Sequence, residues 1–260
     1  MNKSRWGLGI IITISTLIIL GCFYTPYDPA EIRVSERLQA PSKVHWAGTD
    51  HFGRDILSRI FVGGRISLLV GVAAVALGSS VGTLLGLWSG FKGGIWDEIL
   101  MRFTDGFYAL PFILLALLLA TVWGPGVPVV LWAIAAGNIP IFLRLSRTQA
   151  LKIKAELYVE AARALGASNL RLLWAHILPN IRSTLLVQFS ASLAGAILVE
   201  ASLSYLGVGI QPPQPSWGRM LREAQSYASL APWAVWAPGL FMALTIIGFN
   251  LVGDDLIDKR

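Results

Sequence analysis

The stretch EAARALGASNLRLLWAHILPN, from Glu160 to Asn180, decides how the rest of this sequence is interpreted. It carries a Glu, two Arg and a His, yet it lies between long apolar runs. A Gly near its middle and a Pro near its end divide it into short segments that favour helix. The segment therefore predicts a polar helical element inserted into an otherwise apolar chain.

A helix is predicted over residues 155–165, because small and apolar residues recur there at the spacing of one helix face. These residues are Leu157, Ala161, Ala164 and Leu165. Gly166 fits the left-handed position that commonly ends a helix, and Ser168 can cap a second helix before Pro179. This helix–Gly–helix element fits an amphipathic helix on a membrane surface, and it fits a docking surface for a partner protein equally well.

The composition indicates a membrane protein. Of the 260 residues, 55% are hydrophobic and only 14% are charged, whereas a soluble domain carries roughly a quarter charged residues. The formal net charge of +6 is no footprint of nucleic-acid binding, since the basic residues lie beside apolar runs, where they orient helices in a bilayer. We therefore expect no nucleic-acid partner and extensive contact with lipid.

About six apolar stretches are long enough to cross a bilayer, which needs about 20 residues each. Their backbone polar groups must be satisfied inside lipid, so they are predicted to be helices. The predicted spans are 6–24, 66–90, 103–123, 127–145, 184–206 and 234–252. A row of small residues in the second span, Gly78, Gly82 and Gly86, predicts close packing on a neighbouring helix.

The basic residues orient these spans. With the N-terminus inside the cell, thirteen of the 21 Lys and Arg fall in inside segments, which favours two cytoplasmic termini. The basic stretch from Arg144 to Arg182 contributes most to this asymmetry. Three arginines at the start of the second span, Arg54, Arg59 and Arg65, oppose it.

The single cysteine, Cys22, excludes an intrachain disulfide. It follows the first apolar run in a context that resembles a lipoprotein cleavage site. We favour the alternative, a first membrane helix with an incidental Cys, because the rest of the chain is itself apolar enough to cross the membrane several times.

Four motifs resemble one family. Glu160-Ala161-Ala162, then Gly166, then His176-Ile177-Leu178-Pro179 resembles the EAA loop of permease subunits of binding-protein-dependent ABC importers. The ending HILPN is similar to the dipeptide, oligopeptide and nickel branch of that family. Three further stretches agree with that branch, namely residues 45–68, 200–221 and 249–260. The resemblance implies the type I ABC importer permease fold, all-α, with about six transmembrane helices and a cytoplasmic coupling helix.

The resemblance also implies how the chain is organised. Residues 1–63 would form a first transmembrane helix and an extracytoplasmic loop. Residues 64–260 would form the permease domain, with a coupling loop at about 155–180. In this family the coupling helix sits in a cleft of the ATP-binding subunit, and Glu160, Ala161, Ala162 and Gly166 match its motif.

The implied partners are a second homologous permease, two ATP-binding subunits and an extracytoplasmic solute-binding protein. The sequence lacks GxxxxGK[ST], so it predicts no nucleotide site of its own. We therefore expect no enzymatic activity and no cofactor in this chain, with ATP and Mg bound by the partner subunits. The expected location is the bacterial cytoplasmic, or inner, membrane.

Glu200 lies near the outer end of the fifth span, where a carboxylate is costly unless it faces protein or water. It is predicted either to act as a pathway or gate group or, as we favour slightly, to hydrogen-bond to the loop that follows.

Two charged pairs, Asp50–Arg54 and Asp55–Arg59, have i,i+4 spacing and predict a solvated or interfacial helix face. A docking role for a solute-binding protein is the alternative. Three histidines, His45, His51 and His176, show no spacing typical of a metal site, so no metal site is predicted.

The sequence therefore predicts half of the pore of an ATP-driven importer that works by alternating access. The expected cargo is peptides or nickel and other metal chelates, between which the sequence does not discriminate. A secondary transporter is one alternative, and a structural membrane subunit without an ATPase partner is another.

Overall fold

The computed structural model of the protein describes the backbone of residues 3–258. The side chains of residues 3–5, 22–23 and 257–258 lie outside that description, so the question about Cys22 does too, as do Lys259 and Arg260. Within the described residues the chain forms helices and no strand. The predicted all-α class is confirmed.

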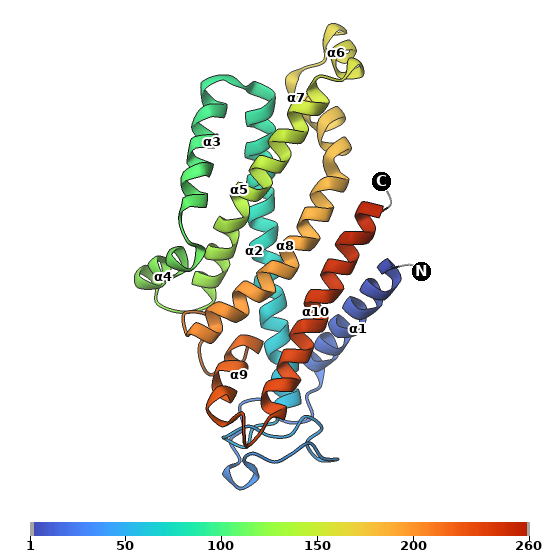
Figure 1. Ribbon diagram of the computed structural model, residues 1–260. Helices are drawn as coiled ribbons and strands as arrows, with labels where there is room; N and C mark the ends of the chain where they lie inside the picture. Colours follow the sequence, from blue (N-terminus) through green and yellow to red (C-terminus); the bar gives the residue numbers. More distant parts are fainter. Residues whose placement is uncertain (1–2, 259–260) are drawn as a thin grey trace.

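The helices follow each other in a simple order along the chain (Figure 1). The long helices of the bundle are α1 (Lys3–Phe23), α2 (Ile56–Lys92), α3 (Gly94–Ala109), α4 (Phe112–Trp123), α5 (Val127–Lys154), α8 (Leu178–Leu206) and α10 (Trp233–Asp258). Shorter elements join them: η1 (Val34–Glu36), α6 (Leu157–Ala164), α7 (Asn169–Arg171), the π-helix η2 (Leu172–Ile177), α9 (Trp217–Ala224) and η3 (Gln225–Tyr227).

Within residues 3–258, four helical stretches are long and apolar enough to cross a membrane. They contain α2, α5, the run from α7 to α8, and α10. A fifth span results if α3 and α4 are counted together, and the apolar part of α1 that was tested, Trp6–Gly21, is shorter. These helices correspond in order to the six predicted spans.

The second span begins earlier than predicted. Helix α2 starts at Ile56, ten residues before the expected Ile66, and runs for 37 residues. Asp55 caps it by accepting a hydrogen bond from the Ser58 backbone N–H. Arg59, in the first turns of this helix, is tolerated because it pairs with Glu223 inside the protein. The predicted boundary between residues 1–63 and residues 64–260 therefore falls inside this helix.

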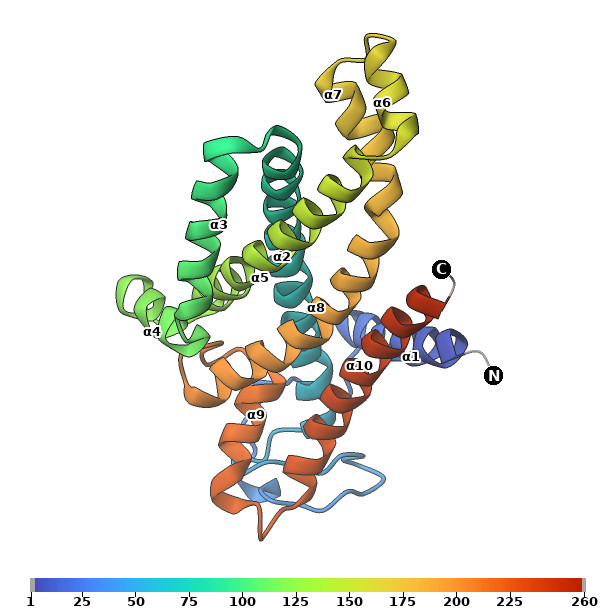
Figure 2. The same cartoon turned by 45° about the horizontal axis from the view of Figure 1, so that its top comes forward.

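The third predicted span, Phe103–Trp123, is wrong as a single continuous helix. It begins at Gly94 and breaks between α3 and α4, whose axes differ by 90°. Pro111 lacks a backbone N–H and disfavours helical geometry in the preceding residue, so Leu110 is extended, with ψ 123°. Figure 2 shows α4 turned away from the direction of α3.

The predicted row of small residues packs on α5. A β-carbon added to Gly78 would lie 2.4 Å from the carbonyl oxygen of Ala135, and one added to Gly82 would lie 2.4 Å from that of Ile139. The prediction of close packing is therefore confirmed, and α5 is the neighbour.

Ion pairs hold α3 to the C-terminal half of α5. The guanidinium of Arg147 donates to both carboxylate oxygens of Asp97, at 2.5 and 2.6 Å. Arg144 pairs with Asp105 in the next turns. The basic stretch that helped to orient the spans thus also fixes the position of α3.

The two ends of the bundle differ in character. One end carries α6 and α7, which project beyond the other helices (Figures 1 and 2). The other end carries α9 and the loop that joins α1 to α2. We call these the coupling end and the α9 end. The last described residues lie beside α1, because α1 packs along α10.

Candidate functional site

The predicted coupling segment, residues 155–180, forms the helix–Gly–helix element expected from the sequence. Helix α6 ends at Ala164, and Gly166 adopts a left-handed conformation, with φ +86°. Ser168 then accepts a hydrogen bond from the backbone N–H of Arg171, at 3.3 Å, and caps α7. The predicted roles of Gly166 and Ser168 in the local structure are confirmed.

The tip of this segment carries exposed apolar side chains. The predicted helix face turns outward, with Leu157 82% exposed and Leu165 89% exposed. Among the motif residues, Glu160, Ala161 and Gly166 are exposed, whereas Ala162 is half-buried against the protein's own core. Apolar side chains that are this exposed at a projecting tip are typical of an interaction surface.

The root of the segment is packed into the bundle. Val159 from α6 joins Leu172 and Ile177 from η2 in a buried cluster. Tyr158 accepts a hydrogen bond from the side-chain amide of Asn180 at 3.1 Å. The exposed tip is therefore connected to α8 through packed side chains.

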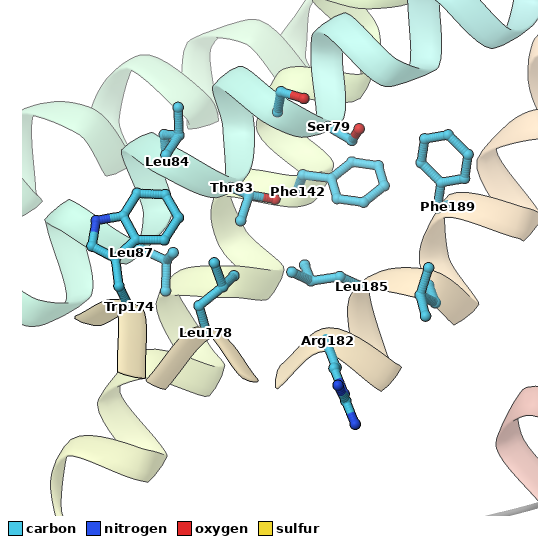
Figure 3. A pocket seen from close by; sticks show the side chains of 12 residues that line it. Ser79, Thr83, Leu84, Leu87, Phe142, Trp174, Leu178, Arg182, Leu185 and Phe189 are labelled. Carbon is cyan, nitrogen blue, oxygen red and sulfur yellow. The ribbon is translucent and has the colours of Figure 1, made fainter. Parts of the chain in front are cut away.

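A cavity of about 500 Å³ lies beside this root, between α2, η2 and α8. Figure 3 shows Thr83 and Leu84 of α2 facing Trp174 of η2 and Leu178 of α8 across it. Arg182 lies at its edge, with the guanidinium directed away from the leucines. The π-helix η2 contributes Leu172 and Ile177 to the buried cluster and Trp174 to this cavity, and α2 and α8 also contribute to both. Helices of the π type occur frequently at functional sites.

Charged residues at the α9 end form a buried network, not the predicted solvated face. Asp50 is 4% exposed and Arg59 is 2% exposed. Arg54 donates to Asp50 at 2.7 Å, which confirms the first predicted pair. Glu223 of α9 accepts from Arg54 at 2.8 Å and from Arg59 at 3.0 Å. Asp50 and Arg59 are buried, and the side chains of Arg54 and Glu223 are only 13% and 17% exposed, so the network leaves little surface for a docking partner.

The second predicted pair, Asp55–Arg59, does not form. Asp55 instead accepts from the Ser58 hydroxyl at 2.7 Å and contacts a ring nitrogen of His45 at 2.9 Å. The other ring nitrogen of His45 lies 3.3 Å from Glu36. Within the described residues, no group of three or more His, Cys, Asp or Glu could hold a metal ion.

Two aromatic groups next to the network have perturbed acid–base properties. His51 stacks against Phe52 and Tyr227, with ring centroids 4.0 and 4.9 Å apart. Burial lowers the pKa of the His51 imidazole, with Arg54 and Arg59 acting in the same direction. Burial also raises the pKa of Tyr227 to about 12.

Glu200 is fully buried in α8. Its carboxylate accepts from the Ser204 hydroxyl at 2.8 Å, and the Ser204 oxygen accepts from the Ile210 backbone N–H at 3.0 Å. This chain of hydrogen bonds is the one expected if Glu200 holds the loop after α8. A role in the pathway or as a gate stays a prediction.

The comparison with protein families is decisive for the chain as a whole. The family described as "Binding-protein-dependent transport system inner membrane component" matches residues 82–259, more than half of the chain.

The chain belongs to this family.

Close relatives of this inner membrane component agree. The chain is 41% identical over 261 residues to the dipeptide transport system permease protein of Alkalihalophilus pseudofirmus, covering 99% of this chain and 86% of the relative. It is 42% identical over 253 residues to the glutathione transport system permease protein of Pectobacterium atrosepticum, covering 97% of this chain and 84% of the relative. The corresponding glutathione permease of Escherichia coli is 43% identical over 249 residues, covering 95% and 82%.

A solved structure shows the same fold. The methionine ABC transporter MetNI, in an inward-facing conformation, superposes with a TM-score of 0.62 at 18% identity, covering 76% of this chain and 94% of that chain. The type I ABC importer permease fold is thereby confirmed. This inner membrane component is thus a permease subunit of an ABC importer, in which separate subunits hydrolyse ATP.

Several features of the structure were not predicted from the sequence. Glu223 and Arg219 were not connected to the Asp50 network, because Glu223 lies 164 residues from Arg59 along the chain. The α3–α4 break had a local signal in Leu110-Pro111. The cavities had no local signal in the sequence, because they form between helices that are distant along the chain.

Proposed function

We propose that this chain forms one half of the translocation pore of an ATP-driven importer of short peptides. It pairs with a second homologous permease, and this pair works with two ATP-binding subunits and an extracytoplasmic solute-binding protein. Short peptides are favoured because relatives that are 41–43% identical are permeases for dipeptides and glutathione. Both termini and the coupling end face the cytoplasm, as the distribution of Lys and Arg favours.

The observation that carries the proposal is the exposed apolar tip on a packed root. Glu160, Ala161, Ala162 and Gly166 belong to a segment that docks on an ATP-binding subunit. Leu157 and Leu165 supply apolar area to that contact, and exposed Ala161 lets a partner backbone approach closely. Half-buried Ala162 supports the contact from behind by packing against the root.

Coupling follows from the continuity of this segment with α8. When ATP draws the two ATP-binding subunits together, the docked tip moves with them. The motion passes through η2 to α8 and changes the packing around the cavity next to Trp174. Access then switches from one side of the membrane to the other by rigid-body tilting of the helices.

A cross-linking experiment tests the docking. Cys22 is replaced by Ser, Ala161→Cys is introduced, and a series of cysteines is placed on the candidate ATP-binding subunit. We expect cross-links from position 161 whose yield changes when ATP is added to the membranes. The matched control is Ala30→Cys, an exposed alanine in the loop at the α9 end, which should give none.

The proposal fails if position 161 forms no cross-link in membranes that contain both folded subunits. It also fails if Ala30→Cys cross-links equally well, because the two positions lie at opposite ends of the bundle. The secondary-transporter and structural-subunit alternatives have no support from the relatives.

A further inference from the structure

A second cavity, of about 280 Å³, lies between α4, α5 and α8. Three polar side chains line it, Asn138 from α5 and Gln188 and Ser192 from α8. All three lie in the central parts of apolar helices that are long enough to span the membrane. Polar side chains at that depth are costly, and they typically face a pathway or a water-filled space.

The hydrogen-bonding capacity of these side chains is only partly used. The Asn138 amide nitrogen donates to the Ile134 carbonyl at 2.8 Å, and the Gln188 amide nitrogen donates to the Ser192 hydroxyl at 3.4 Å. Asn138 and Ser192 are each only 8% exposed. Within the described residues, the side-chain carbonyl oxygens of Asn138 and Gln188 accept no hydrogen bond, and neither oxygen is completely buried, so both are free to accept one from a molecule in the cavity.

The break between α3 and α4 borders the same space. Phe112, in the first turn of α4, lines this cavity and also a neighbouring one of about 160 Å³. Its ring lies over Gly137, since a β-carbon added there would be 3.2 Å from the ring. Irregular backbone at membrane depth is tolerated where it is covered by protein or lines a cavity, so the break fits a position beside a transport path.

The residues lining the cavity determine what it can bind. No Asp, Glu, Lys, Arg or His is among them, so the cavity suits the uncharged amide of a peptide, and the terminal ammonium and carboxylate groups of that peptide would lie outside its walls. Carboxamides both donate and accept hydrogen bonds, and a peptide amide needs one acceptor and one donor. Mostly apolar walls with a few polar groups are typical of small-molecule sites of this size.

We infer that this cavity is a cargo site that holds a peptide backbone amide through Asn138, Gln188 and Ser192 during passage through the membrane. Small residues such as Gly195 leave the space for the cargo, and Phe112 forms its movable wall. The inference rests on the proposed function, because it assigns the site within this subunit that the proposed peptide cargo contacts.

The experiment uses the complete importer in proteoliposomes, with dialanine and glutathione as radiolabelled probes. Gly195→Phe fills the cavity, and nothing lies within 4 Å of a β-carbon added at Gly195, so the change does not force a clash at the first added atom. We expect uptake to fall to the level seen without ATP, with all subunits still present in the purified complex. Gly106→Phe on α3 is the matched control, since it also meets open space, and it should transport normally.

Asn138→Leu tests whether the Asn138 side chain recognises the cargo. The substitution removes the carboxamide group and nearly conserves the side-chain volume. Removing one hydrogen bond should reduce uptake by about 3–10-fold, the equivalent of a typical single hydrogen bond. Gly195→Ala should retain uptake, because one methyl group leaves most of the space open.

Each outcome has one meaning. If the wild-type importer transports neither peptide with ATP, the proposed function is overturned, and the cargo site with it. If the wild type transports but Gly195→Phe and Asn138→Leu do so equally well, only the cargo site is overturned. If Gly195→Phe loses the second permease during purification, the cavity belongs to the subunit interface and the inference is wrong.

Discussion

Individual side chains at the α9 end are held in protonation states that folding selects. His51 is packed between two aromatic rings, where burial disfavours its charged form, and Arg54 and Arg59 act in the same direction. The neutral imidazole is therefore the form that fits the folded protein. Burial, helped by the negative charges of Asp50 and Glu223, raises the pKa of Tyr227 to about 12.

Acidification should weaken this end of the protein. Because the pKa of His51 is lowered in the folded state, its contribution to stability is complete above the unfolded value of about 6.5. It is lost as the pH falls below that value, because the unfolded chain then binds the proton more readily. We expect the melting temperature of the purified protein to fall between pH 7 and pH 5, and His51→Phe to reduce that fall. An identical fall in the variant would show that other groups are responsible.

At the scale of elements, α2 and α5 form the most extensive helix pair in the described chain. The contact is close because Gly78, Gly82 and Gly86 bring the α2 backbone against α5. In lipid there is no hydrophobic driving force that brings helices together. Close van der Waals packing between small residues supplies the attraction instead.

Gly82→Val should separate this pair. The added carbons would meet the Ile139 carbonyl oxygen at 2.4 Å and Phe142 at 2.9 Å, and overpacking of this kind costs about 1–3 kcal/mol or more. We expect a lower melting temperature in detergent. Gly106→Val, which meets open space on α3, is the control and should melt close to the wild type. Equal melting of the two variants would contradict the tight contact.

The whole molecule is joined at the α9 end by charges from distant parts of the chain. Glu223 pairs with Arg54 of the loop before α2, with Arg59 of α2 and, at 2.9 Å, with Arg219 of α9. The network fixes this end of the bundle, while the coupling tip projects from the other end. This arrangement is compatible with the proposed docking of an ATP-binding subunit at the end opposite to the network.

Glu223→Gln should weaken the contacts that hold the α9 end of the bundle together. It removes the counter-charge shared by Arg54 and buried Arg59, and breaking a buried ion pair typically costs about 3–5 kcal/mol. We expect a clear loss of thermal stability in the purified protein. Glu98→Gln, which removes an exposed partner of Arg102, should cost less than about 1 kcal/mol. If both substitutions cost the same, the buried network does not hold the molecule together.

The sequence by itself determined the all-α class, the order of the spans and the coupling segment. Hydropathy, glycine spacing and helix caps act over a few residues, so they can be recognised along the chain. Gly166 and Ser168 behave as their neighbours predict. The motif around Glu160 identifies the family for the same reason, because it is a contiguous stretch.

Only the tertiary structure decided which charges are buried, where the cavities lie and which way the coupling face turns. Asp55 contacts Ser58 and His45 and does not pair with Arg59. Arg59 pairs with Glu223, which lies 164 residues away along the chain. Asn138 and Gln188 meet at one cavity because α5 and α8 pack side by side. Such pairings depend on distances that arise when the helices assemble, and local spacing along the chain does not encode them.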